Sequence, residues 1–399
     1  MNSKNHILVI NCGSSSLKFA LINVESRQQQ ITGIAQCLAT KDANITFKFQ
    51  GSKKQVSLSA PYNHQSALDA LIEFLSENQL SEKLGAIGHR VVHGGETYHL
   101  PTRIDEHVLE TLEQLSTLAP LHNPANIMGI NAALDAFPDL PQVAVFDTAF
   151  HQTMPQHAYT YPIPASLYKE HGIRKYGFHG TSHYYVSHKS AQLLGKDVSE
   201  VNLVTAHLGN GCSVTSVKGG KSIDSSMGFT PLAGVAMGTR CGDIDPGIIF
   251  HLTTQLDYTV EDVEKMLNKE SGLFGMSGIS NDCRTLEEQA LNENNVDAQR
   301  ALDVFTFLIA KSIAAMAVSL PSLDGIVFTG GIGENSDYVR QQVTHHLSIL
   351  GLEIDPEKNK QARFGAALDI SASSSRSIIV MPTDEEWVIA EQTNQLVRG

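Results

Sequence analysis

Three glycine-rich stretches carry the strongest chemical signal in this sequence. Residues 11–16 (NCGSSS), 209–213 (GNGCS) and 330–334 (GGIGE) each follow a short apolar run. Glycine allows a ligand to approach the backbone closely, and exposed backbone N–H groups bind phosphate oxygens. Ligands of α/β sheets bind beyond the carboxyl ends of the strands. The three stretches therefore predict turns that converge on one polyanionic ligand.

The first stretch lies within VINCGSSSLKF, which contains a single lysine. Its turn would offer backbone N–H groups and serine hydroxyls to an anion, and Lys18 would add a point charge. A serine-rich hairpin turn without a ligand fits the same letters, because short Gly/Ser motifs recur by chance. The stretch alone leaves both interpretations open.

Two arginines lie among glycines rather than in a helical pattern, Arg90 in HRVVHGG and Arg240 in MGTRCGDIDP. Each guanidinium could clamp a carboxylate or phosphoryl group through two hydrogen bonds, and structural anchoring is the alternative. Two carboxylates are best placed for Mg²⁺: Asp147 after the apolar run QVAVF, and Glu385 in PTDEEW. Mg²⁺ typically takes one or two carboxylates together with substrate phosphates.

Two motifs resemble known catalytic signatures without completing them. KGGKS (residues 218–222) lacks the first glycine of a P-loop, because Thr215 occupies that position. S-x-x-K at residues 15–18 fits a serine acylase, but it leads into a strand pattern and no K-T-G follows. Neither motif predicts the chemistry of this chain.

Paired histidines raise the possibility of zinc. His89/His93 and His179/His183 have the i, i+4 spacing of zinc ligands on a helix. Glycines lie within or beside both segments, and no H-E-x-x-H is present. Histidines that donate a hydrogen bond in a cleft, or that are satisfied within a loop, are the favoured interpretation.

Apolar periodicity predicts the elements that hold these residues. Residues 7–59 contain five strand patterns, and a helix follows with Ser66 as its N-cap. In the second half, VNLVTAHL–turn–CSVTSVK repeats the order of ILVI–turn–SLKFALI, and DGIVFT is a further strand that meets a glycine-rich turn. The repeat predicts a duplicated α/β domain. The C-terminal segment DEEWVIAEQTNQLV predicts a helix that packs on the first domain.

Composition excludes several classes of function. The 399 residues carry a formal net charge of −13, which offers no footprint for nucleic acid or an anionic membrane surface. No apolar run approaches the roughly 20 residues of a membrane helix, and the N-terminal segment does not fit a signal peptide. The five cysteines form no C-x-x-C pair, which predicts reduced thiols in a cytoplasmic protein.

The motifs resemble those of the acetate kinase family along the whole chain. The segments that carry the resemblance are NCGSSSLKF, HRVVHGG, FDTAFHQTMP, YGFHGTSH, HLGNG, SMGFTPL, MGTRCGDIDP, SGLFGMSG, VFTGGIGENS and PTDEE. The resemblance implies the duplicated actin-like (ribonuclease H-like) fold of actin, hexokinase and Hsp70, with a nucleotide cleft between two domains. Residues 1–150, joined by the C-terminal helix 386–399, would form the first domain, and residues 151–385 the second. The implied activity is the reversible transfer of a phosphoryl group from Mg-ATP to acetate, giving ADP and acetyl phosphate, in a homodimer.

The resemblance also implies roles for individual residues. Asn11, Ser14, Ser16 and Lys18 would face the phosphates, with Asn11 and Glu385 near Mg²⁺. ATP would be held by His207, Leu208, Gly209, Asn210, Gly211, Asp282, Cys283, Arg284, Gly330, Gly331, Ile332, Gly333 and Glu334. Arg90, Arg240 and His179 would stabilise the transferring phosphoryl group, and Asp147 is the acid/base candidate. The acetate methyl group would lie among Val92, Leu121, Phe178 and Pro231.

Three residues depart from the family pattern. Cys212 and Cys241 stand where smaller or hydroxyl residues are expected, and Asp384 stands where asparagine is usual, which leaves the choice of metal ligand between Asp384 and Glu385 open. A propionate or short-chain acyl kinase is one alternative function, because the same motifs serve both activities. An actin/Hsp70-like ATPase, whose nucleotide drives partner binding, is an alternative of a different class. The ATPase would leave Arg90 and Arg240 without an obvious substrate.

Overall fold

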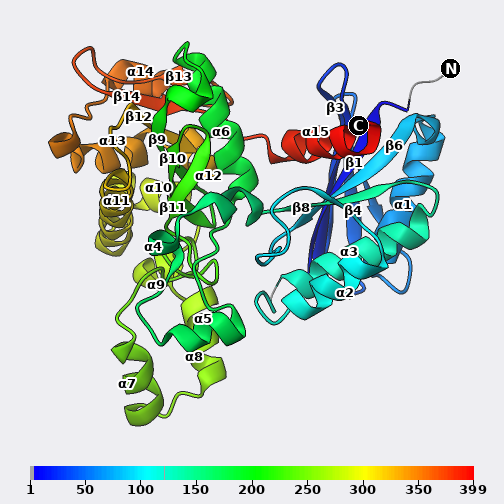
Figure 1. Ribbon diagram of the computed structural model, residues 1–399, viewed down its shortest axis with the longest axis horizontal. Helices are drawn as coiled ribbons and strands as arrows, with labels where there is room; N and C mark the ends of the chain where they lie inside the picture. Colours follow the sequence, from blue (N-terminus) through cyan, green and yellow to red (C-terminus); the bar gives the residue numbers. More distant parts are fainter. Residues whose placement is uncertain (1–3, 121) are drawn as a thin grey trace. The chain divides into compact units, whose positions relative to one another are not determined.

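In the computed structural model, which describes residues 4–120 and 122–399, the chain forms two α/β units (Figure 1). The first unit contains the residues up to Ala149 together with Asp384–Gly399, and the second contains Phe150–Thr383. Each unit is built on one β-sheet.

The sheet of the first unit has the strand order β5-β4-β3-β2-β1-β6-β8-β7. The strands β1, β2 and β3 are antiparallel neighbours, whereas β6 pairs parallel with β1 and β8 pairs parallel with β6. The strand bounds are β1 (His6–Gly13), β2 (Ser16–Asn23), β3 (Gln28–Gln36), β4 (Asn44–Phe49), β5 (Ser52–Ser57), β6 (Leu84–Val91), β7 (Thr102–Arg103) and β8 (Gln142–Phe146).

The sheet of the second unit has the order β11-β10-β9-β12-β14-β13. Here β9, β10 and β11 are antiparallel neighbours, β12 pairs parallel with β9, and β14 pairs parallel with β12. The strand bounds are β9 (Asn202–Leu208), β10 (Cys212–Lys218), β11 (Lys221–Ser225), β12 (Gly325–Thr329), β13 (Leu368–Asp369) and β14 (Ser377–Val380).

Both sheets therefore contain the same five-strand arrangement. Three consecutive antiparallel strands lie on one side, and two later strands continue parallel to the first of the three. The expectation of a duplicated α/β fold is confirmed. The same arrangement also brings the carboxyl ends of the first, fourth and fifth strands of each sheet to one edge, where ligands of α/β proteins bind.

Helices pack on the sheet of the first unit, including the helix at the end of the chain. The C-terminal helix α15 packs against β6, β1 and β8, and α3 packs against β1 and β6 (Figure 1). The helix bounds are α1 (His64–Glu77), α2 (Glu106–Leu115), α3 (Asn123–Ala136) and α15 (Glu385–Arg398).

The second unit has more helices, and the longest is the apolar helix α11. It packs on β10 and β9 of its own sheet and on neighbouring helices α9, α10 and α13. The helix bounds are α4 (Gln156–Tyr159), α5 (Ala165–His171), α6 (Gly180–Leu193), α7 (Gly247–Gln255), α8 (Val260–Lys269), α9 (Gly272–Ser277), α10 (Cys283–Glu293), α11 (Val296–Ala317), α12 (Gly330–Asn335), α13 (Asp337–His345) and α14 (Pro356–Gln361). Within the described part of the chain, no helix is long and apolar enough to cross a membrane.

Three local predictions differ from the structure. The cap of α1 is Asn63, whose side chain accepts from Ser66 N, so Ser66 lies inside the helix. The expected turn after β12 is the short helix α12, which begins directly at Gly330 with φ +76°. Arg90 lies within strand β6 and not in a glycine-rich turn. In that strand the neighbouring Val91 is buried in the core while Arg90 retains partial exposure.

Candidate active site

The first glycine-rich stretch forms a tight hairpin between β1 and β2. Gly13 pairs with Ser16, so only two residues form the turn, and Asn11 pairs directly with Lys18. The side chains of Ser14 and Lys18 are exposed. The prediction of a polar hairpin is confirmed, and its exposed face combines hydroxyls with one ammonium group.

Two buried side chains hold this hairpin from within the first unit. His64, the first residue of α1, forms a 2.8 Å hydrogen bond between its Nε2 and the carbonyl oxygen of Gly13. Asn126 on α3 donates from Nδ2 to the carbonyl oxygen of Cys12 at 2.8 Å, and its Oδ1 accepts from Val92 N. Asn126 therefore joins the end of β1 to the segment after β6, and sequence patterns gave no signal for this role.

Arg90 and Asp147 meet at the carboxyl ends of two parallel strands. Arg90 Nε donates to Asp147 Oδ1 at 2.9 Å, and Arg90 Nη2 donates to Asp147 Oδ2 at 2.7 Å. Asp147 is 2% exposed and follows β8 directly. Burial works against the charge of Arg90, but the carboxylates of Asp147 and Glu385 outweigh it and raise the pKa of the guanidinium. Arg90 is thus a fixed, permanently charged group.

Glu385 joins this cluster as the first residue of α15. Its Oε1 is buried and has no hydrogen-bond partner among the residues that the structure describes. Burial raises the pKa of Glu385, Arg90 lowers it, and Asp147 raises it again. Lys18 also acts electrostatically on this carboxyl group. An unpartnered carboxylate oxygen of this kind is a suitable ligand for a divalent cation.

The neighbouring Asp384 has a structural task. Its carboxylate caps α15 by accepting a 3.0 Å hydrogen bond from Trp387 N. Burial raises the pKa of Asp384. Because Asp384 is occupied as a helix cap and Glu385 Oε1 is not, the geometry favours Glu385 as the metal ligand of this pair.

The first unit also holds part of the expected acetate pocket. The Val92 side chain is 9% exposed and follows β6 immediately. The other predicted residue of this unit, Leu121, lies outside the described residues. Of the pocket residues predicted in this unit, Val92 is therefore the one that the structure describes, and it follows β6, the strand that contains Arg90.

In the second unit, His179 is held by a chain of hydrogen bonds. It precedes α6 with φ +56°, and its Nδ1 lies 2.9 Å from the Ser213 hydroxyl. The same hydroxyl lies 2.7 Å from Nε2 of His183. The other ring nitrogen of His183, Nδ1, lies 2.7 Å from the Thr205 hydroxyl. Burial lowers the pKa of His183 well below its ordinary value, so this ring is neutral. The network fixes the ring orientation of His179.

His179 and Arg240 flank one glycine. A Cβ atom placed on Gly211 would lie 3.4 Å from His179 Nε2 and 3.6 Å from Arg240 Nη1. Arg240 Nη1 donates to the carbonyl oxygen of Pro231 at 3.3 Å. No carboxylate pairs with Arg240 in the part of the chain that the structure describes, and burial lowers the pKa of its guanidinium. A half-buried cation without an anionic partner suits an anionic ligand.

The other predicted residues of this region differ in exposure. His207 lies one residue before the end of β9, and its ring stacks on that of His179 with 4.4 Å between the centroids. Leu208 is completely buried, and the Phe178 ring is 2% exposed, so within this unit Phe178 offers little surface to a substrate. Cys212 donates from its thiol to the carbonyl oxygen of Gly209 at 3.2 Å, which helps to fix the turn.

A cavity of about 760 Å³ lies at the ends of β9 and β12. Its volume falls within the usual range for small-molecule sites. Seven predicted ATP residues line it: Gly209, Asn210, Asp282, Cys283, Arg284, Gly331 and Ile332. Nine other residues line the cavity and were not predicted to bind a ligand: Asn281, Glu287, Glu288, Leu291, Asn292, Asn335, Ser336, Arg363 and Phe364. Asn335 and Ser336 lie at the end of the quoted segment VFTGGIGENS and Asn281 directly precedes Asp282, whereas Arg363 and Phe364 come from a loop that carries no motif.

The remaining residues of the third stretch support the cavity without lining it. Gly330 and Gly333 are buried. Glu334 turns its Oε1 onto the backbone N–H groups of Gly330 at 3.0 Å and Thr383 at 3.1 Å. Burial raises the pKa of Glu334. In this unit Glu334 fixes the path of the chain around the cavity.

The zinc interpretation of His89 and His93 is wrong in its premise, because His89 lies in strand β6 and not on a helix. Its Nε2 is 2.7 Å from Gln142 Oε1, and burial lowers its pKa to about 4. His183 uses both ring nitrogens for hydroxyl groups. Among the described residues, no group of three or more His, Cys, Asp or Glu could hold a metal ion.

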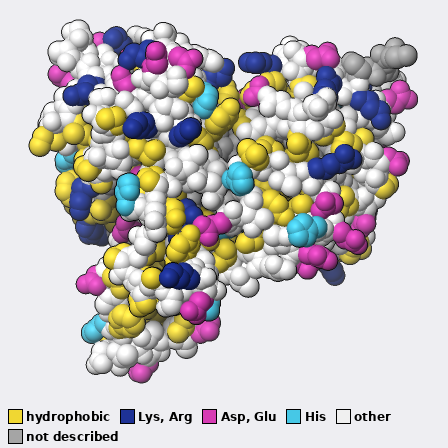
Figure 2. Space-filling view, viewed as in Figure 1, with side chains coloured by type: hydrophobic (Ala, Val, Ile, Leu, Met, Phe, Trp, Pro, Cys, Tyr) yellow, Lys and Arg dark blue, Asp and Glu magenta, His cyan; other side chains and the backbone are white. Residues whose placement is uncertain are grey.

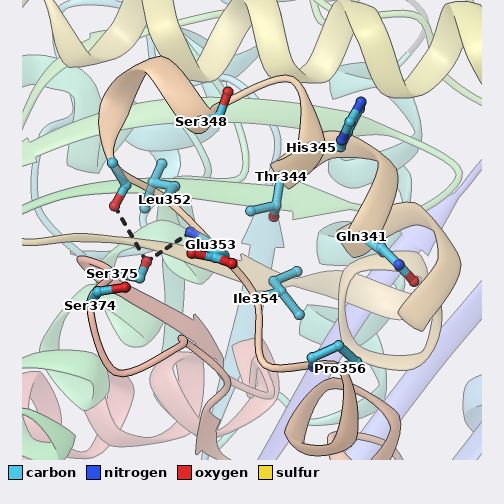
Figure 3. Close-up of a pocket in the computed structure, with 11 residues that line it drawn as sticks. Gln341, Thr344, His345, Ser348, Leu352, Glu353, Ile354, Pro356, Ser374 and Ser375 are labelled. Carbon is cyan, nitrogen blue, oxygen red and sulfur yellow. Dashed lines mark hydrogen bonds between the residues drawn. The ribbon is translucent and has the colours of Figure 1, made fainter.

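A second pocket, of about 420 Å³, lies between α13 and the segments around residues 351–356 and 374–375 (Figure 3). The Ser375 hydroxyl there accepts from Glu353 N at 2.8 Å and donates to the carbonyl oxygen of Gly351 (Figure 3). None of the residues predicted to bind a ligand lines this pocket.

Comparison with known proteins agrees with this geometry. Residues 6–391 match the model of the acetokinase family. The chain belongs to the acetokinase family. An acetate kinase of Shewanella sp. strain ANA-3 is 51% identical over 397 residues, covering 99% of each chain. Two solved structures are similar as well. Acetate kinase from Porphyromonas gingivalis has 38% identity and a TM-score of 0.93, covering 98% of this chain and 100% of the other. A propionate kinase from Francisella tularensis has 45% identity and a TM-score of 0.93, covering 98% and 99%.

Proposed function

We propose that this chain transfers the γ-phosphoryl group of Mg-ATP directly to the carboxylate of acetate. An acetate oxygen attacks the γ-phosphorus, the bond to the β–γ bridging oxygen breaks, and ADP leaves as acetyl phosphate forms. The acetokinase family match and the relatives named acetate kinase support this reaction. An actin/Hsp70-like ATPase would not account for the arginines that the structure leaves available for an anionic substrate.

The observation that carries the assignment of the catalytic groups is the cluster of Arg90, Asp147 and Glu385. Acetate is already ionised near pH 7, so no residue has to remove a proton from it. Catalysis of phosphoryl transfer then consists of positioning and charge stabilisation. Asp147 occupies two donors of Arg90 and leaves Nη1 available for a substrate oxygen. We assign Asp147 as a positioning residue for Arg90 and not as an acid/base.

Arg240 and His179 are the corresponding groups of the second unit. Arg240 has no carboxylate partner among the described residues, and His179 is oriented by Ser213. Both lie beside Gly211, where an added Cβ atom would contact their tips. They would neutralise oxygens of the transferring phosphoryl group. Phe178 directly precedes His179 in the chain, and Pro231 accepts the hydrogen bond from Arg240.

Mg²⁺ fits the residues that the first unit provides. Glu385 Oε1 is a buried carboxylate oxygen without a protein partner in the described chain, and Asn11 lies near the end of β1, where it pairs with Lys18. When bound, Mg²⁺ neutralises charge on the β- and γ-phosphates. Lys18, Ser14 and Ser16 in the hairpin would hold the phosphate chain.

The adenosine part of ATP would occupy the 760 Å³ cavity of the second unit. The residues Asp282, Cys283 and Arg284 begin α10 on one side, and Gly331 and Ile332 lie in α12 on the other. Asp282 caps α10 by accepting from Arg284 N at 3.1 Å, which fixes the start of this helix.

We also propose that the chain is a homodimer in the cytoplasm. A group of exposed apolar side chains on and after α7 supports self-association: Ile248, Ile249, Phe250, Leu256, Tyr258 and Val260. Figure 2 shows hydrophobic side chains at the surface of the α7–α8 region. The five cysteines are free thiols, which is usual for cytoplasmic proteins.

Steady-state kinetics with acetate, propionate and butyrate test the substrate assignment. We expect acetate to have the highest kcat/KM, with propionate slower by about 10- to 200-fold because one methylene is worth ~1–3 kcal/mol. Val92→Ala should narrow the acetate/propionate ratio, since it removes bulk at the methyl site. Val91→Ala is the matched control, because Val91 is buried in the core and should affect stability alone. An unchanged ratio in Val92→Ala would remove Val92 from the pocket, and a preference of the parent chain for propionate would overturn the choice of acetate.

A further inference from the structure

Phe364 combines two features that are rarely found together. Its side chain is 92% exposed, and its backbone has φ +54°. Exposed apolar residues are common, but a bulky side chain in the left-handed region is not, because Cβ approaches the backbone closely there. Such strain persists where the surrounding structure imposes it, and it is found at ligand sites.

The surroundings impose this conformation through Asn335, the last residue of α12. Asn335 Oδ1 accepts from Phe364 N at 3.1 Å, while Asn335 Nδ2 donates to the carbonyl oxygen of Gly331 at 3.0 Å. The preceding Arg363 forms an ion pair with Asp337 at the start of α13. The exposed ring is therefore tied to the same helix that carries Gly331 and Ile332.

A buried guanidinium strengthens this connection. Arg340 is completely buried and donates to the carbonyl oxygens of Gly333 at 2.9 Å and Ala362 at 3.0 Å. Its other donors reach the Oδ1 and carbonyl oxygen of Asn359. Arg340 thus joins α12 to the chain segment that leads into Phe364, and the loop is part of the wall of the cavity.

The ring lies at the lining of the 760 Å³ cavity. Ile332 and Leu291 add apolar surface to this lining, and Asn281, Asn335 and Glu287 add polar groups. A planar heterocycle with polar edges matches this combination, because an aromatic side chain can stack on its face while the polar groups meet its edge.

We propose that Phe364 stacks on the adenine ring of the bound nucleotide. The proposal rests on the assignment of this cavity to adenosine in the proposed function. It adds a binding residue from a loop that carries none of the family motifs quoted above. It also explains why a strained, exposed aromatic residue is held at this position.

Calorimetric titration of the full chain with MgADP tests the proposal. Phe364→Asn removes the ring and keeps a residue that tolerates positive φ, so the backbone should be retained. We expect it to weaken MgADP binding by at least about fivefold, the lower end of base–aromatic stacking. Phe364→Tyr and Phe364→Trp should bind within about twofold of the parent. Inorganic tripolyphosphate, which lacks a base, should inhibit the parent and Phe364→Asn equally.

Ile349→Asn is the matched control, because Ile349 is 89% exposed in the same unit but does not line the cavity. It should leave MgADP affinity unchanged. The proposal would be overturned if Phe364→Asn bound MgADP with the affinity of the parent. It would also be overturned if Phe364→Asn lost tripolyphosphate inhibition to the same extent as MgADP binding. A change of oligomeric state with unchanged affinity would also overturn it and would make the ring a protein contact.

A further variant separates this proposal from the assignment of the cavity. A Cβ atom on Gly331 would meet nothing within 4 Å, so Gly331→Leu should fold normally and fill the cavity. We expect it to weaken MgADP binding strongly. Unchanged affinity in Gly331→Leu would show that the nucleotide binds elsewhere, whereas loss in Gly331→Leu without loss in Phe364→Asn would contradict the stacking alone.

Discussion

Arg90 and Asp147 form a two-point ion pair, with Nε–Oδ1 at 2.9 Å and Nη2–Oδ2 at 2.7 Å. The carboxylate is almost completely buried, and the guanidinium is about one-fifth exposed. This geometry fixes the plane of the guanidinium, and a lysine could not reproduce it. Orienting Arg90 is therefore a role for Asp147 that requires no proton transfer.

Asp147→Asn should lower kcat by about 10- to 100-fold, because losing a carboxylate that holds a functional side chain in place typically has an effect of this size. The profile of kcat against pH between about 6 and 8 should keep its shape, since no titrating base is removed. Asp224→Asn is a control that breaks a comparable ion pair, with Lys175, and should keep kcat within about twofold. A rising limb that is present in the parent and absent in Asp147→Asn would instead establish proton transfer by Asp147.

Arg240→Ala should lower kcat by at least ~10³, the lower end of the contribution of an arginine to phosphoryl transfer. Arg240→Lys should recover little, because a point charge does not replace a planar fork. The urea midpoint of Arg240→Ala should not fall, since no carboxylate partner in the described chain loses its cation. Near-parent kcat in Arg240→Lys would rule out the clamp, and loss of stability in both variants would indicate a structural anchor.

Glu385→Gln should raise the melting temperature at pH 7 in the presence of EDTA. Burial raises the pKa of Glu385, so the folded chain favours the protonated form, and ionisation at neutral pH costs stability. The difference should disappear as the pH falls below the usual glutamate value of 4.5, where the carboxyl group is protonated whether the chain is folded or unfolded. Mg²⁺ should stabilise the parent and not Glu385→Gln.

The exposed neighbour Glu386 provides the control for that experiment. Glu386→Gln should retain the stabilisation by Mg²⁺ and show no comparable gain in EDTA. If Glu385→Gln were still stabilised by Mg²⁺ as the parent is, Glu385 would not be a metal ligand.

Arg340→Leu should lower the free energy of unfolding by about 2–5 kcal/mol, because it leaves buried carbonyl oxygens without donors. The pKa of this arginine is lowered by burial to about 10, which reflects its enclosure. KM for ATP should rise as well, since Arg340 joins both segments of the cavity wall. Urea denaturation measures the first effect, and Lys360→Leu, in an exposed i, i+3 ion pair, should change stability by less than ~1 kcal/mol. Equal stabilities of the two variants would show that the hydrogen bonds of Arg340 contribute little.

The two sheets could be predicted because their signals are local. Short apolar runs or alternating apolar residues mark β1, β2, β9 and β10, and glycines mark the ends of β1, β9 and β10. The motif residues Gly209, Asp282 and Gly331 do meet at one cavity. Asn63 was missed as the cap of α1 because Ser66 is an equally good capping residue by type.

The rest of the site depends on contacts between distant parts of the chain. The hydrogen bond from Phe364 N to Asn335 and the pairing of Arg90 with Asp147 leave no periodic pattern in the sequence. Glu334 belongs to a glycine-rich motif, yet its carboxylate serves backbone N–H groups. Only the folded chain decides whether such a residue faces a ligand or its own backbone.

Trapping of the product tests the central claim most directly. The purified chain is incubated with Mg-ATP, acetate and hydroxylamine, and acetohydroxamate and ADP are quantified together. Direct phosphoryl transfer to acetate predicts one hydroxamate for each ADP, with formation dependent on acetate and lost in Arg240→Ala. Release of ADP without hydroxamate, or at a rate independent of acetate, would contradict the assignment.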